Sequence, residues 1–190
     1  MKNKRHWHVI IEQLRNIPHA VGAEIGVHKG LFASRLLKNL PNIQKYYCVD
    51  PWEFYDDYKK TLRKISPEYK TPKAQIYRVF LRNTSPWQHK RIIIRAKSMD
   101  ALDQIEDNSL DWVFIDACHS YEHARPDIIG WSKKVKVGGL VSGHDFKNAP
   151  SPHRKIQFGV GRAVRELIPE FKVEANTWYT IKQSDNWIKE

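Results

Sequence analysis

The chain contains only 2 cysteines in its 190 residues, Cys48 and Cys118. Two cysteines cannot form the disulfide framework on which small secreted proteins depend, so we expect a reducing compartment. Long apolar runs are also lacking, because no stretch approaches the roughly 20 apolar residues that a membrane span requires. The basic N-terminus is not followed by the apolar core of a signal peptide. These absences predict a cytoplasmic protein with no membrane partner.

Acidic residues are in the minority. The sequence has 21 Asp and Glu against 32 Lys and Arg, which gives a formal net charge of +11. Such an excess suits an anionic partner such as RNA, DNA or a phosphorylated sugar. It equally suits a soluble protein whose lysines are spread over solvated faces, and no long basic run decides between the two. Hydrophobic residues make up 41% of the chain, enough for the core of one domain.

Short apolar runs alternate with stretches of helical spacing. Strands are predicted at residues 21–25, 46–49, 91–95, 111–116 and 139–142, and helices at 7–17, 30–40, 74–81, 121–131 and 161–168. This alternation indicates a Rossmann-like, doubly wound α/β fold, with helices on both faces of a mostly parallel sheet. Two last strands, at 171–174 and 178–182, are close enough to pair as an antiparallel hairpin.

The sequence shows no internal repeat and no linker, so we predict a single domain over residues 1–190. Its first part, residues 1–19, holds an N-terminal helix. Residues 52–90 are charged, aromatic and interrupted by prolines. We expect this segment to form a lid or insert that shapes the pocket of the substrate.

The first strand ends in a turn bracketed by Gly26 and Gly30. Because glycine has no side chain, a ligand can approach the backbone at this turn, and the N-terminus of the following helix favours an anionic group. The G-x-G-x-x-G pattern of dinucleotide binding is absent, because His28 stands where its second glycine would fall. Asp50 ends the second strand, where a carboxylate suits the two hydroxyls of a ribose.

The segment from Glu24 to Gly30 resembles the E/D-x-G-x-x-x-G signature of class I S-adenosylmethionine (SAM)-dependent methyltransferases. Residues 114–122, 138–146 and 159–164 are similar to the methyltransferase 24-like branch, which is related to sugar and small-molecule O-methyltransferases. The resemblance implies that the glycine turn receives the methionine part of SAM, that Asp50 binds its ribose, and that Ser98 and Met99 flank its adenine. The full predicted cofactor set is Glu24, Gly26, Gly30, Asp50, Trp52, Ser98, Met99 and Asp116, in which Trp52 either covers the adenine or belongs to the core.

Ionisable side chains follow two further strands, and a hydroxyl acceptor needs a general base or a metal to remove its proton. The candidates are Asp116, His119, His144 and Asp145. Related catechol-type enzymes place acidic metal ligands after the same two strands, which implies a site at Asp116, His144 and Asp145. His144 stands where an acid is usual, and Mg²⁺ prefers oxygen ligands. Zinc at His119 and His123 is a weaker alternative, since a chain with 9 histidines offers such pairs by accident.

The sequence therefore predicts a SAM-dependent O-methyltransferase that acts on a small metabolite, a sugar or another glycan, with SAM and either Mg²⁺ or no metal. The positive charge favours an RNA or nucleotide methyltransferase as one alternative, although the chain has no Asp/Asn-Pro-Pro-Tyr-like motif. A non-catalytic SAM- or nucleotide-binding module is the other alternative. The ionisable cluster argues against such a module, because a pure binder needs no cluster of this kind.

Overall fold

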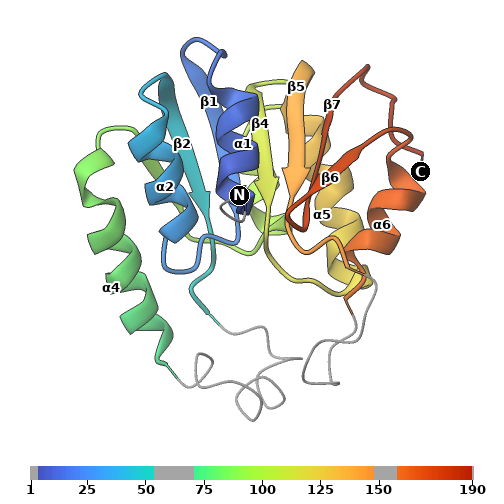
Figure 1. The fold of residues 1–190 in the computed structure, drawn as a ribbon. Helices are drawn as coiled ribbons and strands as arrows, with labels where there is room; N and C mark the ends of the chain where they lie inside the picture. The colour runs from blue at the N-terminus through green and yellow to red at the C-terminus, as the bar shows by residue number, and fades with distance from the viewer. Residues whose placement is uncertain (1–3, 54–70, 148–157, 190) are drawn as a thin grey trace.

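A computed structural model describes residues 4–53, 71–147 and 158–189 (Figure 1). Seven strands form one sheet in the order β3-β2-β1-β4-β5-β7-β6. They are β1 (Ala20–Ile25), β2 (Ile43–Val49), β3 (Arg91–Ile94), β4 (Leu110–Ile115), β5 (Val135–Gly143), β6 (Lys172–Glu174) and β7 (Thr177–Ile181). Strands β1 to β5 run parallel, whereas β7 is antiparallel to both β5 and β6. The predicted mostly parallel sheet with a C-terminal antiparallel hairpin is confirmed.

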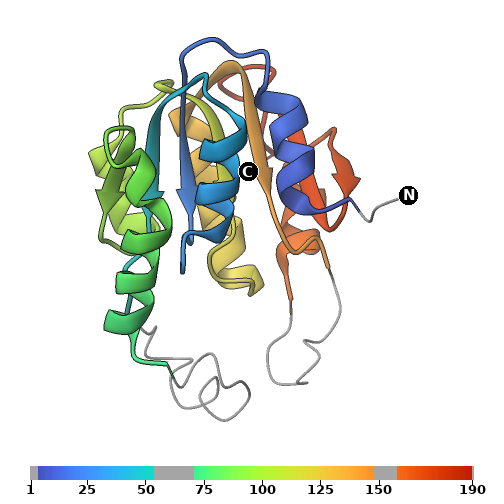
Figure 2. The same cartoon turned by 60° about the vertical axis from the view of Figure 1, so that its left-hand side comes forward.

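Helices cover both faces of this sheet (Figures 1 and 2). One face is covered by α1 (His6–Leu14), α2 (Leu31–Asn39) and α4 (Lys73–Thr84), and the other by α5 (Tyr121–Lys134) and α6 (Val160–Leu167). The described residues also form the short 3-10 helices η2 (Ser85–Trp87) and η3 (Met99–Gln104). None of the helices in the described ranges has the length and apolar character required to cross a lipid bilayer.

Strand β4 explains why the sheet needs helices on both sides. Its side chains alternate between the faces, and both sets are apolar. Trp112 and Phe114 are buried in the layer below α1, α2 and α4, whereas Val113 and Ile115 are buried below α5 and α6. Burial of each such side chain contributes about 1.5–3 kcal/mol, so neither face can be left open to water.

Two strands begin earlier than the apolar pattern predicts. Strand β2 starts at Ile43 because it pairs with β1 there, although its second and third residues, Gln44 and Lys45, are exposed and polar. Strand β5 starts at Val135 for the same reason, before the exposed Lys136 and Val137. Backbone pairing therefore extends both strands beyond their buried part.

The predicted lid is narrower than residues 52–90. Helix α4 lies within that segment, but its Ile76 and Phe80 are buried against the rest of the layer that α2 helps to form. Residues 73–84 therefore belong to the cover of the sheet. Residues 54–70 lie outside the described part of the chain, so a lid over those positions stays a prediction.

Candidate functional site

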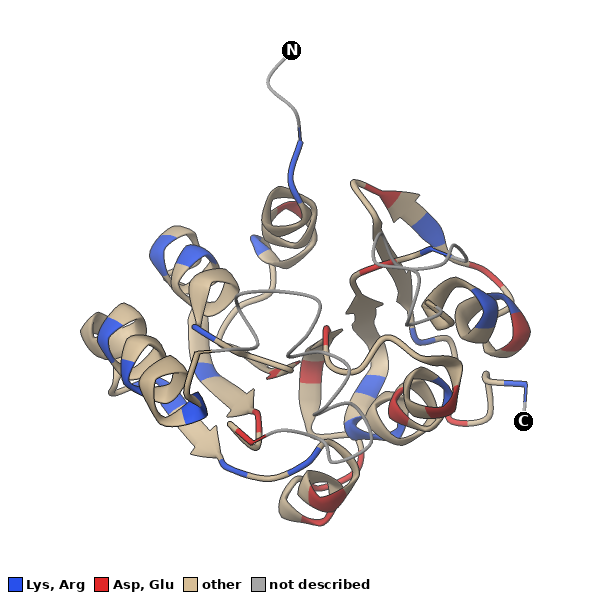
Figure 3. Cartoon of the chain, turned by 90° about the horizontal axis from the view of Figure 1, so that it is seen from below, with Lys and Arg blue, Asp and Glu red and all other residues tan. Residues whose placement is uncertain are grey.

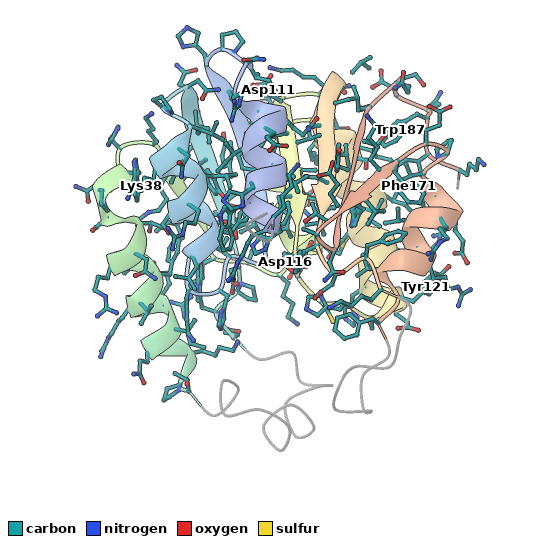
Figure 4. The ribbon with its side chains drawn as sticks, in the orientation of Figure 1. Lys38, Asp111, Asp116, Tyr121, Phe171 and Trp187 are labelled. Atoms are coloured by element: carbon teal, nitrogen blue, oxygen red, sulfur yellow. The ribbon has the colours of Figure 1, made fainter. Side chains whose placement is uncertain are left out.

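The residues that leave four parallel strands lie at one edge of the sheet. The N–H of each donates to the last carbonyl of an adjacent strand, at N···O distances of 2.8–3.2 Å. These exit residues are Gly26, Asp50, Asp116 and His144. Figure 4 labels Asp116 at the lower end of β4, where this edge lies. This alignment places these four predicted site residues at the carboxyl ends of the strands, where ligands bind in open α/β sheets.

The glycine turn brings β1 against the exit of β4. Gly26 has φ +90°, and a Cβ there would lie 2.2 Å from the carbonyl oxygen of Asp116. Gly30 has φ +69° and begins α2, and its Cβ would lie 2.8 Å from the ring of Phe80. Gly26 is thus required by the approach of two strands, and Gly30 by the packing of α2 on α4.

The carboxylate of Asp50 braces the same turn. It accepts hydrogen bonds from the backbone N–H groups of His28 at 2.8 Å and Trp52 at 2.7 Å. Each carboxylate oxygen can accept a second bond, so both oxygens keep capacity for a ligand hydroxyl. Asp50 combines a structural task with the predicted contact to a ribose, which stays a prediction.

Trp52 is buried, with 2% of its surface exposed. Its indole Nε1 donates to the carbonyl of His28 at 2.8 Å, and its ring centroid lies 4.8 Å from that of Tyr77 and 4.6 Å from that of Phe80. This packing favours a place in the core for Trp52 over a role in covering the adenine.

Ser98 and Met99 point in different directions at the start of η3. The Ser98 hydroxyl is buried, donates to the carboxylate of Asp127 and accepts from the indole N–H of Trp131 at 2.8 Å. Met99 is 45% exposed. Of these two side chains, Met99 is the one that a ligand at the surface can reach.

Asp127 predicts a measurable pH dependence of stability. Burial, opposed by the hydrogen bond from Ser98, raises the pKa of Asp127 to about 6, against about 3.9 in an unfolded chain. The folded state therefore holds a proton that the unfolded state loses. This contribution to stability is complete below pH 4 and is lost as the pH rises to 6.

We expect the wild type to lose about 2 kcal/mol of unfolding free energy relative to Asp127→Asn between pH 4 and pH 7. The amide keeps an acceptor for Ser98 but does not titrate. Urea unfolding of both proteins at the two pH values measures the difference. Parallel changes in the two proteins would show that Asp127 does not titrate in this range.

Glu24 lies beneath the glycine turn rather than at its surface. It is 2% exposed and accepts a hydrogen bond from the hydroxyl of Tyr46 at 2.7 Å. Burial raises the pKa of Glu24 well above its usual value, and the charges of Asp116 and Asp50 add to this effect. The protonated form is therefore favoured, and Glu24 supports the turn from the core.

The three predicted metal ligands come together. One ligand atom from each of Asp116, His144 and Asp145 lies within 4.8 Å of those of the other two. The His144 Nδ1 is 3.8 Å from an Asp116 oxygen and 3.5 Å from an Asp145 oxygen. His119 joins the group through its Nε2, 3.5 Å from the second oxygen of Asp145. Three of the four predicted catalytic side chains thus converge at the edge of the sheet, and His119 contacts this group through Asp145.

The electrostatics of this cluster favour the neutral forms of Asp116, His119 and His144. Burial, and then the negative charge of Asp145, raises the pKa of Asp116 to about 8. Burial also lowers the pKa values of His119 and His144, although Asp145 opposes the shift in both. Both imidazoles are then free to accept a proton or to bind a metal ion near neutral pH. The Lys147 ammonium, 3.3 Å from Asp145, supplies a positive charge to the cluster.

The sequence did not point to His6, which lies beside this cluster. Its ring centroid is 4.7 Å from that of His144 and 5.5 Å from that of Phe32, on which it stacks. Burial, followed by repulsion from His144, lowers the pKa of His6 to about 4. Ion pairs of Lys4 with Glu12 and Glu174, at 2.7 and 2.6 Å, hold the start of α1 in place. No local pattern predicts this contact, because it depends on how α1 docks.

A family model described as a methyltransferase domain (Methyltransf_24) matches residues 23–146. The chain belongs to this methyltransferase family. The match begins one residue before Glu24 and ends one residue after Asp145. It therefore contains the glycine turn and every member of the cluster around Asp116, and it confirms the family resemblance drawn from the sequence. No curated protein matches the sequence.

Solved structures share the fold of this methyltransferase at low sequence identity. A putative caffeoyl-CoA O-methyltransferase from Staphylococcus aureus has 13% identity and a TM-score of 0.62 over 96% of this chain and 85% of its own. An O-methyltransferase family protein from Burkholderia thailandensis has 12% identity and a TM-score of 0.58 over 93% and 56%. MycE, from the mycinamycin biosynthetic pathway and in complex with Mg, S-adenosylhomocysteine (SAH) and mycinamycin VI, has 18% identity and a TM-score of 0.60 over 95% and 49%. The chain thus spans about half the length of the latter two proteins.

Proposed function

We propose that this methyltransferase transfers the methyl group of SAM to a hydroxyl oxygen of a small metabolite or sugar. The observation that carries the proposal is the convergence of Asp116, His119, His144 and Asp145 beside the glycine turn. Methyl transfer from a sulfonium to oxygen needs an aligned donor and acceptor and a group that removes the hydroxyl proton. The complex of MycE with SAH supports SAM as the donor in a chain of the same fold.

The cofactor would lie along the exits of β1, β2 and β3. In this arrangement the turn from Gly26 to Gly30 receives the methionine part, and Asp50 accepts hydrogen bonds from the ribose hydroxyls. Met99 lies beside the adenine, while Glu24, Trp52 and Ser98 support these contacts from buried positions. The transferable methyl group would then face Asp116.

Asp116, His144 and Asp145 fit a divalent metal ion. Their ligand atoms converge, all three residues are half-buried, and two are carboxylates. The imidazole of His144 makes this a mixed nitrogen and oxygen set, which suits a borderline transition metal better than Mg²⁺. A bound ion would lower the pKa of the acceptor hydroxyl and fix its direction.

The same residues offer a second way to activate the acceptor. His119 and His144 are held neutral by burial, so either imidazole can accept the hydroxyl proton. Asp145 lies 3.5 Å from a nitrogen of each and would stabilise the imidazolium that forms. Chelation separates the two mechanisms once an acceptor is known, because only the first is abolished by EDTA and restored by a divalent metal.

Calorimetric titration tests the cofactor directly. SAM and SAH are both expected to bind, since they share the amino acid, ribose and adenine groups that the strand exits would hold. NAD is expected not to bind, because the turn lacks the second glycine of a pyrophosphate-binding loop. Binding of NAD without any response to SAM or SAH would overturn the proposed function.

Asp50→Ala is expected to weaken SAH binding by roughly 10- to 150-fold. This range corresponds to the 1.5–3 kcal/mol that charge-assisted hydrogen bonds to the ribose contribute. Asp111→Ala is the matched control, because its carboxylate also accepts a backbone N–H, from Val21 at 2.8 Å. SAH titration of both variants, with their folding checked by circular dichroism, gives the comparison. Equal affinities in the two variants would make Asp50 a turn residue only.

A further inference from the structure

The entire net charge of the chain originates in two segments. Residues 29–49 and 71–97 contain 11 Lys and Arg and no Asp or Glu, whereas the rest of the chain has 21 of each kind. These segments contain α2, β2, α4 and β3, which are adjacent at one edge of the sheet. Figure 3 shows the bands of Lys and Arg on α2 and α4. The excess charge is therefore a local property of this part of the molecule.

Four of these cations lie on the adjacent helices α2 and α4, and we call them the basic face. Arg35 and Lys38 lie one turn apart on α2, Arg78 and Arg82 lie one turn apart on α4, and all four are exposed. Most apolar side chains of both helices are buried, with Leu31 of α2 as an exposed exception. The helices touch where a Cβ at Gly30 would meet Phe80 and Thr84 of α4, and on the other side of α2 the guanidinium of Arg35 lies over the ring of Trp7, 5.6 Å from its centroid.

A second feature of the basic face is how little its charges are compensated. Elsewhere, some cations pair with carboxylates, as Lys134 does with Asp107 and Arg162 with Glu166. Among the described residues, no Asp or Glu forms an ion pair with the four cations of the basic face. Like charges one turn apart on a helix repel each other and destabilise it. An external anion that binds to the basic face would compensate these charges and remove the repulsion.

We propose that the basic face binds the phosphate backbone of a nucleic acid. Three of its four cations are arginines, whose guanidinium groups bind phosphates with two parallel hydrogen bonds. Along each helix the two cations lie three or four residues apart, which is about 4.5–6 Å along the axis. A membrane surface fits less well, because an interfacial helix exposes an apolar face and these helices bury most of their apolar side chains.

The basic face leaves the proposed active site open. Figure 4 labels Lys38 on the upper part of α2 and Asp116 at the opposite, lower edge of the sheet. A nucleic acid bound at the basic face would thus anchor or localise the methyltransferase while a separate small molecule is methylated. This inference does not depend on the identity of the methyl acceptor.

Fluorescence anisotropy with a labelled 20-nucleotide RNA, and with the same sequence as duplex DNA, tests the proposal. In the basic-face variant all four cations are replaced by alanine. The control variant removes four exposed cations from elsewhere in the chain, by Arg15→Ala, Arg162→Ala, Lys172→Ala and Lys189→Ala. Both variants therefore have the same net charge.

We expect the basic-face variant to bind at least one of the two probes at least 10-fold more weakly than the wild type at 50 mM salt. The slope of log Kd against log salt should fall by about one for each lost phosphate contact. The control variant should bind the probes with an affinity within about 3-fold of that of the wild type. Both variants should keep the SAH affinity of the wild type, as evidence that they are folded. Equal weakening in the two variants, or no binding by the wild type at 50 mM salt, would overturn the proposal. Equally effective competition by polyglutamate or by phosphatidylserine vesicles would replace the nucleic acid with another class of polyanion.

Discussion

Replacement of Gly26 by alanine is expected to lower the free energy of unfolding by about 2–5 kcal/mol and to abolish SAH binding. The backbone strain at φ +90° contributes about 1–2 kcal/mol, since L-residues other than Gly are disfavoured there. The larger contribution is steric. A methyl group at Gly26 would overlap the backbone of Asp116 and Ala117, with the nearest atom at 2.2 Å. The exits of β1 and β4 would have to separate, which costs typically another 1–3 kcal/mol.

Gly138→Ala is the matched control for this substitution. Gly138 also has a positive φ, +83°, but no atom lies within 4 Å of the position its Cβ would take. Gly138→Ala should therefore lower the free energy of unfolding only by the strain contribution, and the variant should keep its affinity for SAH. Urea unfolding and SAH calorimetry of both variants measure the two effects. Equal losses of stability would mean that β1 and β4 can relax around the added methyl group.

Local sequence was sufficient to predict the fold because the buried strands are short and strongly apolar. In β4 every buried side chain from Trp112 to Ile115 fills one of the two layers, so the run of four apolar residues has a single structural explanation. Local sequence failed where pairing rather than burial determines structure, as at Gln44 and Lys45 in β2. For α4 the helix was predicted, at residues 74–81, but its charged and aromatic composition hid its place in the core layer.

The candidate site was predictable to the extent that strand ends define it. Asp116, His144 and Asp145 follow two apolar runs directly, and parallel neighbouring strands must bring such residues together. His6 was not predictable, because only the docking of α1 places it beside His144. The structural role of Asp50 was also not predictable. The backbone N–H groups that donate hydrogen bonds to its carboxylate reach it only after the turn has folded.

Divalent cobalt is expected to bind this chain at least 100-fold more tightly than Mg²⁺. The reason is the imidazole of His144 in the set with Asp116 and Asp145, because nitrogen ligands strengthen binding along the series from Mn²⁺ to Cu²⁺. His144→Asp creates an all-oxygen set and should narrow this preference, whereas Asp145→Ala should remove most of the affinity for both ions. Asp185→Ala is the control, since that exposed carboxylate pairs with Lys182 and is not part of the metal-capable group described above.

The pH dependence of metal binding gives this prediction an independent readout that needs no acceptor. Asp116, with its pKa raised to about 8, is mostly protonated at pH 7, and a metal ligand must be deprotonated. Binding should therefore release close to one proton at pH 7 and become tighter as the pH rises to 8, with little further gain above. Calorimetry in buffers of different ionisation enthalpy measures the released proton. Asp116→Asn should abolish the proton release and weaken binding. If the wild type shows neither metal binding nor proton release, the cluster acts without a metal, and the neutral imidazoles of His119 and His144 remain as the groups that accept the proton of the hydroxyl.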